Sequence, residues 1–441
     1  MTTIRNRRTR SRPATALFVG LLAIALLACS TGIDPGASPA ASAAPSSTGT
    51  GSALFDASRV HDITLTVDED AVAAALATYA ATGEKAWIEA TLTIDGSTYE
   101  RVGIRLKGNS SLRSLSDGRG GSSIGASDDP ATLPWLIDLD QFVDGQAHEG
   151  VVELVVRSSS TQTALNEAVA LELLERAGLA SQQAIAARFR VNDGEAILRL
   201  VVENPDDVWM ADAFSSDGAL YKAESSGDYS YRGEDPSSYA EVFDQEAGKD
   251  DADLGPLIDF LQFVNESDDA TFAEDLAEHL DVDAFVTYLA MQEVVQNFDD
   301  IDGPGNNSYL YYDPATGIFT VVPWDYNLAF GVGFGAPGGE GGAGFGGPAD
   351  GDDPPPGDGA GPRPGGGPDG RSNVLVERFL AIDGNQALVD ARTAELKASL
   401  LDSGEAEAIL ADWVEVLTSQ ASDLVDPATV EAEAEQVAAQ L

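Results

Sequence analysis

The spacing of apolar residues changes near Asn204, and this change constrains the fold more than any other feature of the sequence. Before Asn204, apolar and polar residues alternate over short runs, as they do in strands with one buried face. After Asn204, apolar residues recur every three to four positions, as they do in helices that bury one side. We therefore expect an α+β protein with a sheet-rich N-terminal lobe and a helical C-terminal lobe.

Two turn sequences predict β-hairpins in the first half. Asp95-Gly96 lies between predicted strands at residues 87–94 and 98–106, and Asn192-Asp193-Gly194 lies between predicted strands at 185–191 and 196–203. Further strands are predicted at 62–67 and 151–157, and helices at 71–79 and 164–177, the latter ended by Gly178.

The second half is predicted to be mainly helical, at residues 255–264, 271–280, 282–296, 373–380 and from 386 to the end. One hairpin, made of 309–312 and 318–322, interrupts the helices. Residues 331–371 consist mostly of Gly, Pro and Asp, so we expect a disordered insert there, followed by C-terminal helices over 372–441.

The N-terminal segment has the pattern of a bacterial lipoprotein signal. Residues 1–28 combine an arginine-rich start with an apolar run that is too short to span a bilayer, and this run ends at Leu26-Leu27-Ala28 before Cys29. Cys29 is the single cysteine of the sequence, so it has no disulfide partner within the chain. We expect a lipidated Cys29 that anchors the protein to the outer face of the cell membrane, with a flexible tether over residues 29–55.

The charge balance restricts the partners of this protein. The chain has 73 acidic and 25 basic side chains and a net charge of −48. Such a surface repels nucleic acid, so no nucleic-acid partner is expected. A phosphate ligand must be held by locally placed cations or by a divalent metal.

Residues 298–325 carry the densest set of candidate ligands. The loop FDDIDGPGNNS at 298–308 contains Asp299, Asp300 and Asp302, and antiparallel pairing of the following hairpin should bring this loop close to Asp325. Hard oxygen ligands that converge in this way suit Mg²⁺, and a nearby carboxylate can accept a proton from a hydroxyl. The alternative is a loop that only makes turns and holds a structural calcium ion. Which of the three aspartates acts as the base stays open.

A cationic strand face precedes a small polar loop. In residues 101–107 the side chains of Arg101, Arg105 and Lys107 alternate with apolar ones, which places the three cations on one face. Residues 108–111, Gly-Asn-Ser-Ser, follow directly and offer backbone amides without bulk, which suits an oxyanion.

Several motifs follow one another in a fixed order: IRLKGNSSL at 104–112, LPWLIDLDQFVDGQ at 133–146, ALNEAVALELLERAG at 164–178, LRLVVE at 198–203, GALYK at 218–222, NFD at 297–299, YLYYDP at 309–314 and FTVVPWDYNLAFG at 319–331. As a set, they resemble the kinase family named after spore coat protein H (CotH), and the last three motifs match it best. The resemblance covers roughly residues 56–331 and implies a two-lobed fold like that of atypical protein kinases. Residues 56–205 would form the nucleotide-binding lobe and residues 206–330 the catalytic lobe. The implied activity is transfer of phosphate from ATP to a protein Ser or Thr hydroxyl with Mg²⁺ or Mn²⁺.

The resemblance also implies roles for individual residues. Asp299 would be the catalytic aspartate and Asp325 the metal ligand, helped by Asn306 or Asn307. The cofactor-binding residues would be Lys107 on a phosphate, Arg105 and Asn109 beside it, Glu167 as the helix acid that pairs with a phosphate-binding lysine, and Glu203 in a hinge-like strand.

The chain departs from the family pattern in three places. Leu133 precedes Pro134 where the family usually has Lys, and Asn327 stands where a second acid usually follows the Trp-Asp pair. The Gly-rich stretch that begins at Gly331 interrupts the region after Asp325. Two alternatives to an active kinase therefore remain: an inactive CotH-like binding module, and a calcium-stabilised structural lipoprotein of the envelope. The protein substrate and any role in sporulation are not determined by the sequence.

Overall fold

The computed structural model describes residues 52–108, 112, 129–214, 216–224, 227–249, 252–301, 307–332 and 373–441. The predictions for the leader, for Cys29, Asn109, Asp302 and Asn306, and for nearly all of the 331–371 insert lie outside these residues.

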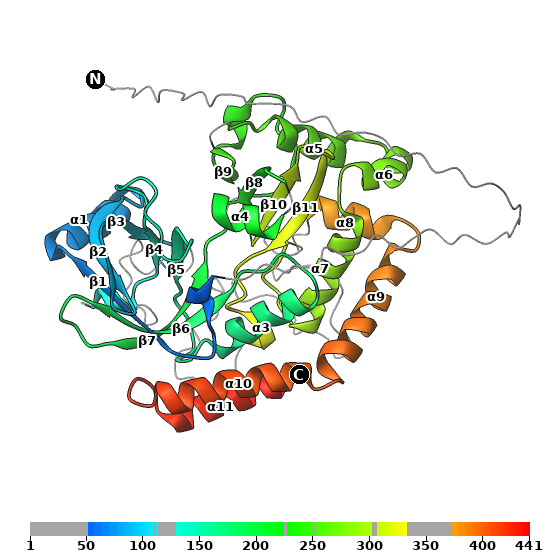
Figure 1. Cartoon of the computed structure of the whole chain (residues 1–441). Coiled ribbons are helices and arrows are strands. Elements are labelled where there is room, and N and C mark those ends of the chain that lie inside the picture. Colours follow the sequence, from blue (N-terminus) through cyan, green and yellow to red (C-terminus); the bar gives the residue numbers. More distant parts are fainter. Residues whose placement is uncertain are drawn as a thin grey trace, which may run out of the picture. The chain divides into compact units, whose positions relative to one another are not determined.

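A closed barrel forms the first part of the described chain, with the strand order β1-β2-β3-β4-β5-β7-β6 (Figure 1). All neighbouring strands are antiparallel except β1 and β6, which pair in parallel and close the barrel. The barrel strands are β1 (His61–Val67), β2 (Ile88–Ile94), β3 (Ser97–Leu106), β4 (Trp135–Asp138), β5 (Glu153–Val156), β6 (Ala184–Val191) and β7 (Ile197–Glu203).

Local turn chemistry explains the barrel hairpins. Asp95 and Gly96 adopt φ values of 48° and 84°, and Asn192 adopts 53°, as a tight hairpin requires. The predicted hairpins β2–β3 and β6–β7 are therefore confirmed. Inside the barrel, alternate residues such as Ile63, Leu65 and Ile104 form one buried core, and α1 (Glu69–Thr82) packs against it through Val72 and Tyr79.

A four-stranded sheet with the order β11-β10-β8-β9 follows the barrel within the described residues. Its strands are β8 (Ala219–Ala223), β9 (Phe243–Ala247), β10 (Ser308–Asp313) and β11 (Ile318–Pro323). The predicted β10–β11 hairpin is confirmed. The description of the second half as one hairpin among helices was incomplete, because β8 and β9 extend this hairpin into a sheet.

The second sheet is covered on both faces. Leu310, Phe319 and Val321 point into the core that the sheet shares with α5 (Gly255–Glu266) and α7 (Val282–Val294). The opposite face packs through an aromatic cluster, which includes Tyr309, Tyr311 and Trp324, onto outward-facing residues of β4 and β5 and onto α4 (Asp207–Ala213). This aromatic cluster joins the sheet to the outside of the barrel.

Helices complete the structure and confirm the mixed α+β prediction. The predicted helix at 271–280 is instead α6 (Asp269–Asp275) followed by a 3₁₀ turn at Leu276–Glu278. Two C-terminal helices, α10 (Glu405–Gln420) and α11 (Pro427–Ala438), lie along α3 (Leu165–Arg176) (Figure 1). The remaining helices are α8 (Val374–Ala381) and α9 (Asn385–Leu396).

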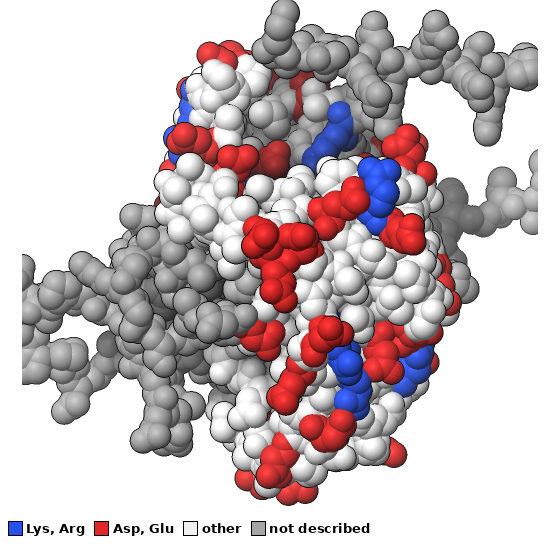
Figure 2. Space-filling model, turned by 90° about the vertical axis from the view of Figure 1, so that its left-hand side faces the viewer, with Lys and Arg blue, Asp and Glu red and all other residues white. Residues whose placement is uncertain are grey.

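The surface agrees with the acidic composition. On the face drawn in Figure 2, Asp and Glu side chains cover far more area than Lys and Arg. Among the described residues, none of the helices combines the length and the apolar character needed to cross a bilayer.

Close packing at Gly218 gives a test of the second sheet. A Cβ at this position would lie 2.3 Å from the Tyr312 carbonyl oxygen and 2.6 Å from the Tyr311 ring. We expect Gly218→Ala to lower the free energy of unfolding by about 1–3 kcal/mol, measured by urea denaturation. Gly83→Ala is the control for backbone strain without a clash, since nothing lies within 4 Å of its Cβ but its φ of 76° disfavours alanine. Unlike the control, Gly218→Ala should change the near-ultraviolet circular dichroism of the tyrosines; identical spectra for the two variants would contradict this packing.

Candidate functional site

A buried arginine joins three segments at the centre of the candidate site. Arg157, directly after β5, donates from Nε to Oε2 of Glu167 on α3 at 3.1 Å, and its Nη2 forms an ion pair with Oε1 of the same carboxylate at 2.8 Å. The Nη2 atom also donates to Oδ1 of Asp325, which follows β11. The side chains of Arg157 and Glu167 are 10% and 3% exposed, whereas that of Asp325 is 28% exposed. Asp325 is therefore the member of this trio that a ligand can reach.

Charge complementarity stabilises the trio. Burial alone would lower the pKa of Arg157, but the charges of Asp325 and Glu167 outweigh burial and raise it. Burial raises the pKa of Glu167, and the positive charge of Arg157 opposes this effect. A buried ion pair needs hydrogen bonds as well as opposite charges, and Arg157 donates one hydrogen bond to each of the two carboxylates.

Neighbouring groups fix the backbone on both sides of Arg157 and Asp325. The buried Arg199 of β7 donates to the carbonyl oxygen of Arg157 at 2.8 Å from Nε. Asp325 adopts a φ of 64°, a left-handed conformation that costs energy for a residue with a side chain. The Tyr326 hydroxyl accepts a hydrogen bond from Gln292 of α7 at 2.6 Å, which ties the segment after β11 to this helix.

The predicted approach of the acidic loop to Asp325 is present. Ser308 pairs with Pro323 and Tyr309 with Val322, so the start of β10 lies beside the end of β11. Burial raises the pKa of Asp299, and the charge of Asp325 raises it further, while a hydrogen bond from Asn307 lowers it. Asn307 also donates to the Asp299 carbonyl oxygen at 2.7 Å.

The neighbouring Asp300 has a different environment from Asp299. It is 8% exposed, and its charge raises the pKa values of the Tyr288 and Tyr326 hydroxyls, which places it among buried tyrosines. Asp299 is less buried and interacts with Asp325. Of the two described aspartates, Asp299 is therefore better placed to meet a ligand at Asp325.

Lys107, at the end of β3, lies next to this group. Its Nζ is 5.5 Å from the centre of the Trp324 ring, and Arg157 stands over the same ring at 5.6 Å. The Nζ donates to Oδ1 of Asn204 at 3.1 Å, and the Asn204 amide donates to Glu153 at 2.6 Å. Asn204 thus fixes the direction of the lysine side chain.

The ionisation of Lys107 depends on the second sheet. Its pKa is lowered to about 8, mainly by burial; the charges of Lys222 and Arg105 also act to lower the pKa, and those of Glu246 and Glu153 act to raise it. For Glu246 of β9, burial would raise the pKa, but Lys107 and other cations hold it at about 2. Glu246 is therefore ionised and is the main counter-charge of Lys107.

The other predicted cofactor-binding residues are more scattered. Arg105 lies 4.8 Å from the Trp87 ring, and its buried Nε has no hydrogen-bond partner. Arg101, expected on the same face, instead adopts a φ of 58° near a bulge and pairs with the exposed Glu89. The Glu203 carboxylate accepts a 2.7 Å bond from the Gln183 amide, and burial raises its pKa to about 7.

The donor set can be tested against a divalent metal. Within the described residues, no three His, Cys, Asp or Glu side chains gather into a metal site. However, Mg²⁺ in phosphate-transfer sites is commonly held by one or two carboxylates, with phosphate oxygens and waters as the other ligands. Asp325 and Asp299, with Asn307 beside them, fit this mode of binding and do not fit an all-protein cage.

The sequence analysis did not identify three residues that contribute to the candidate site. Arg157 and Asn204 bond to residues far away in the sequence, and Glu246 acts on Lys107 through its charge across the fold, so no local spacing marks these roles. The one available signal was for Arg157: a cation at the end of a predicted strand in a chain with few cations.

Comparison with known proteins gives two matches. A family model described as CotH kinase protein matches residues 104–429. The inner spore coat protein H of Bacillus subtilis (strain 168) is 27% identical over 168 residues, which make up 37% of this chain and 45% of that protein. The aligned part therefore spans less than half the length of this relative.

Removal of the central guanidinium tests the trio. Arg157→Met leaves Glu167 and Asp325 without their counter-charge, and we expect the free energy of unfolding to fall by about 3–5 kcal/mol. Arg101→Met, which breaks an exposed pair, should cost less than about 1 kcal/mol. Both values come from denaturant titrations at neutral pH. Equal losses in the two variants would show that Arg157 does not carry this role.

Proposed function

The chain belongs to the CotH kinase family, and from this premise we propose that it transfers phosphate from ATP to a Ser or Thr hydroxyl of a protein substrate. The proposal includes a two-lobed arrangement like that of atypical kinases. The barrel and its β3 end would bind the nucleotide, and the segments around Asp299 and Asp325 would supply the reacting end.

One observation carries this proposal: Lys107 and Arg157 lie over the Trp324 ring, Asp325 accepts a hydrogen bond from Arg157, and the charge of Asp325 acts on Asp299. A cation for phosphate, a carboxylate for metal and a second carboxylate for a proton are the parts that phosphoryl transfer needs. A loop that only holds a structural calcium ion gives no reason for two partly buried cations, Lys107 and Arg157, to lie beside it.

Each residue has a distinct task in the proposed reaction. Asp325 and Asn307 would hold Mg²⁺ or Mn²⁺, which supplies neutralising charge to the phosphates when bound. Lys107 would contact a phosphate oxygen, directed by Asn204. Asp299 would orient the substrate hydroxyl and accept its proton. Glu167 would act through Arg157, which keeps the Asp325 carboxylate in one orientation.

The place of action is also a proposal. The relative is named an inner spore coat protein, and the first 28 residues here have the pattern of a lipoprotein signal. We infer an exported protein that is held at the outer face of the cell membrane through lipidated Cys29 and acts on a protein of the cell surface.

Nucleotide-dependent stabilisation tests the proposal most simply. With Mg²⁺ or Mn²⁺ and ATP at 100 times its Kd, the free energy of unfolding should rise by about 2.7 kcal/mol. Thermal unfolding with metal alone, nucleotide alone and both together separates the alternatives. An inactive binding module of the same family predicts no effect of nucleotide, and a calcium-stabilised protein predicts a shift with metal alone.

Two matched variants separate binding from phosphate transfer. Asp325→Asn should abolish metal-dependent nucleotide binding, because the carboxylate ligand is lost. Asp299→Asn should keep that binding but stop transfer from γ-labelled ATP, because the proton acceptor is lost. Labelling of a substrate by both variants at the parent rate would rule out the kinase assignment.

The buried lysine predicts a pH dependence. Above pH about 8, Lys107 loses its proton in the nucleotide-free protein. ATP affinity should then fall by roughly tenfold per pH unit, if the neutral lysine does not bind phosphate. Lys107→Arg stays charged and should show no such fall between pH 7 and 9.5. Parallel profiles for the parent and Lys107→Arg would exclude Lys107 as the phosphate contact.

The same lysine affects stability in the opposite sense. Between its folded pKa of about 8 and its ordinary value of 10.5, the folded state binds fewer protons than the unfolded state. The contribution of Lys107 to the free energy of unfolding therefore rises with pH through this window. Lys107→Arg should lack this contribution in nucleotide-free denaturation curves.

A further inference from the structure

We propose that Glu433 on α11 is a positioning residue for the transfer reaction: it fixes the first turn of α3 and, through α3, the Glu167–Arg157–Asp325 link. This inference rests on the proposed function for its catalytic consequence. Its structural part concerns the nucleotide-free protein and can be tested without any activity.

The start of α3 lacks a local side-chain cap. Ala164 occupies the N-cap position with a φ of 55°, and no side chain at this position bonds to the helix. The first amides of a helix have no partner within the helix, so they must bond elsewhere. Thr161 and Thr163 serve the amides of Ala164 and Leu165 at 3.1 and 3.3 Å.

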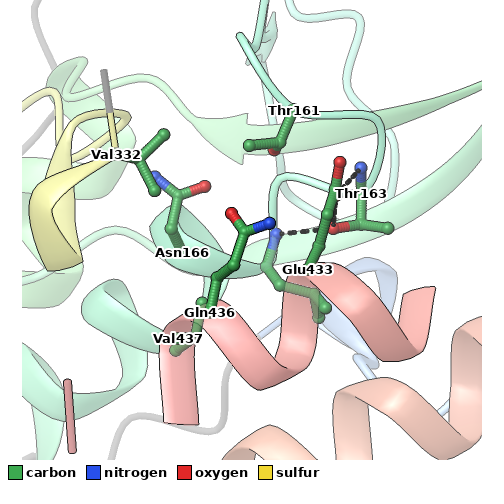
Figure 3. A pocket seen from close by; sticks show the side chains of 8 residues that line it. Thr161, Thr163, Asn166, Val332, Glu433, Gln436 and Val437 are labelled. Carbon is green, nitrogen blue, oxygen red and sulfur yellow. Dashed lines mark hydrogen bonds between the residues drawn. The ribbon is translucent and has the colours of Figure 1, made fainter. Parts of the chain in front are cut away.

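Glu433 anchors the loop that carries these threonines. Its carboxylate accepts hydrogen bonds from the amides of Gln162 and Thr163, both at 2.9 Å, and from the Thr163 hydroxyl at 2.5 Å. Figure 3 draws the bonds between Glu433 and Thr163. The carboxylate lies at the N-terminal end of α3, where the helix dipole favours negative charge. A residue that is 270 positions away in sequence therefore fixes the loop whose threonines bond the first amides at the start of α3.

The C-terminal helices also hold the rest of α3. Trp413 of α10 donates to Glu172 at 2.6 Å, and Arg176 pairs with Glu405 at 3.3 Å. These contacts restrain the middle and the end of α3. Glu433 supplies the corresponding restraint at the start, where the site lies.

The first turn of α3 carries the residues that reach the site. Glu167 lies one helical turn after Thr163 and bonds to Arg157. Asn166 donates to the Asn327 carbonyl oxygen at 2.7 Å, two residues beyond Asp325. In Figure 3, Asn166 and Glu433 line the same small hollow. A shift of this turn would therefore move both the arginine clamp and the segment after Asp325.

Glu433 also lies outside residues 104–429, the part of the chain that matches the family model. The restraint on α3 is thus supplied, in this chain, by a residue outside the matched segment. This separates the inference from the roles that family membership implies.

Glu433→Ala and Glu431→Ala form a matched pair for the experiment. Both remove a glutamate from α11, but Glu431 is exposed, whereas Glu433 is partly buried against the loop. We expect Glu433→Ala to lower kcat by about 10- to 100-fold with little change in the KM for ATP, because misplacement affects the reacting geometry more than nucleotide binding. Glu431→Ala should match the parent. Glu433→Gln keeps an acceptor oxygen and should restore part of kcat.

Two further measurements distinguish positioning from general destabilisation. Amide hydrogen exchange of the nucleotide-free variants should be faster for Glu433→Ala at Gln162, at Thr163 and at Tyr326, whose amide bonds to Glu167. Glu433→Ala should also reduce kcat less in a Glu167→Gln background than in the parent, because both act through one link.

Each of these measurements has a result that would contradict the role of Glu433. Parent-like exchange at Tyr326 in Glu433→Ala, or full additivity with Glu167→Gln, would overturn the inference. A parent protein that transfers no phosphate would overturn the proposed function instead. The exchange at Tyr326 would then decide by itself whether Glu433 positions α3.

Discussion

The guanidinium of Arg157 connects the end of β5, the start of α3 and the segment after β11, and the candidate site depends on this connection. Arg157 and Glu167 are almost fully buried, so neither charge can be left without its partner. The surrounding structure therefore has to hold all three segments in register. Arg199 holds the Arg157 carbonyl oxygen from within the barrel, and Glu433 holds α3 from the C-terminal helices. A barrel, a sheet and a distant helix pair thus converge on one ionic contact.

Those parts of the fold that follow from local chemistry could be predicted from the sequence. Asp95-Gly96 identified the β2–β3 hairpin, and Gly178 marked the end of α3, because each needs a backbone conformation that few residues adopt. β8 and β9 could not be predicted in the same way. Each is five residues long. β8 pairs with β10, which lies far along the chain, and β9 pairs with β8 across a long connection. The parallel pairing of β1 with β6 that closes the barrel is likewise non-local.

The residues of the candidate site also differ in whether local sequence could predict their contacts. The proximity of Asp299 to Asp325 could be predicted from the sequence, because the β10–β11 hairpin between them is local and its pairing is antiparallel. Arg157 could not be assigned to Asp325, since 168 positions separate them. The sequence also predicted a lysine as the partner of Glu167, whereas in the structure the partner is Arg157 and Lys107 bonds to Asn204. Lys107 and Arg157 both lie over the Trp324 ring, so the predicted lysine lies close to the true partner of Glu167 but is not that partner.

The most direct test of the central claim is the position of a bound metal ion. A crystal of the protein soaked with Mn²⁺ and a non-hydrolysable ATP analogue would be measured for anomalous scattering from manganese. We predict a peak at the Asp325 carboxylate, beside the analogue's phosphates, with Lys107 on a phosphate oxygen and Arg157 still bonded to Glu167. A peak elsewhere, or phosphates bound away from the Trp324 ring, would contradict the account.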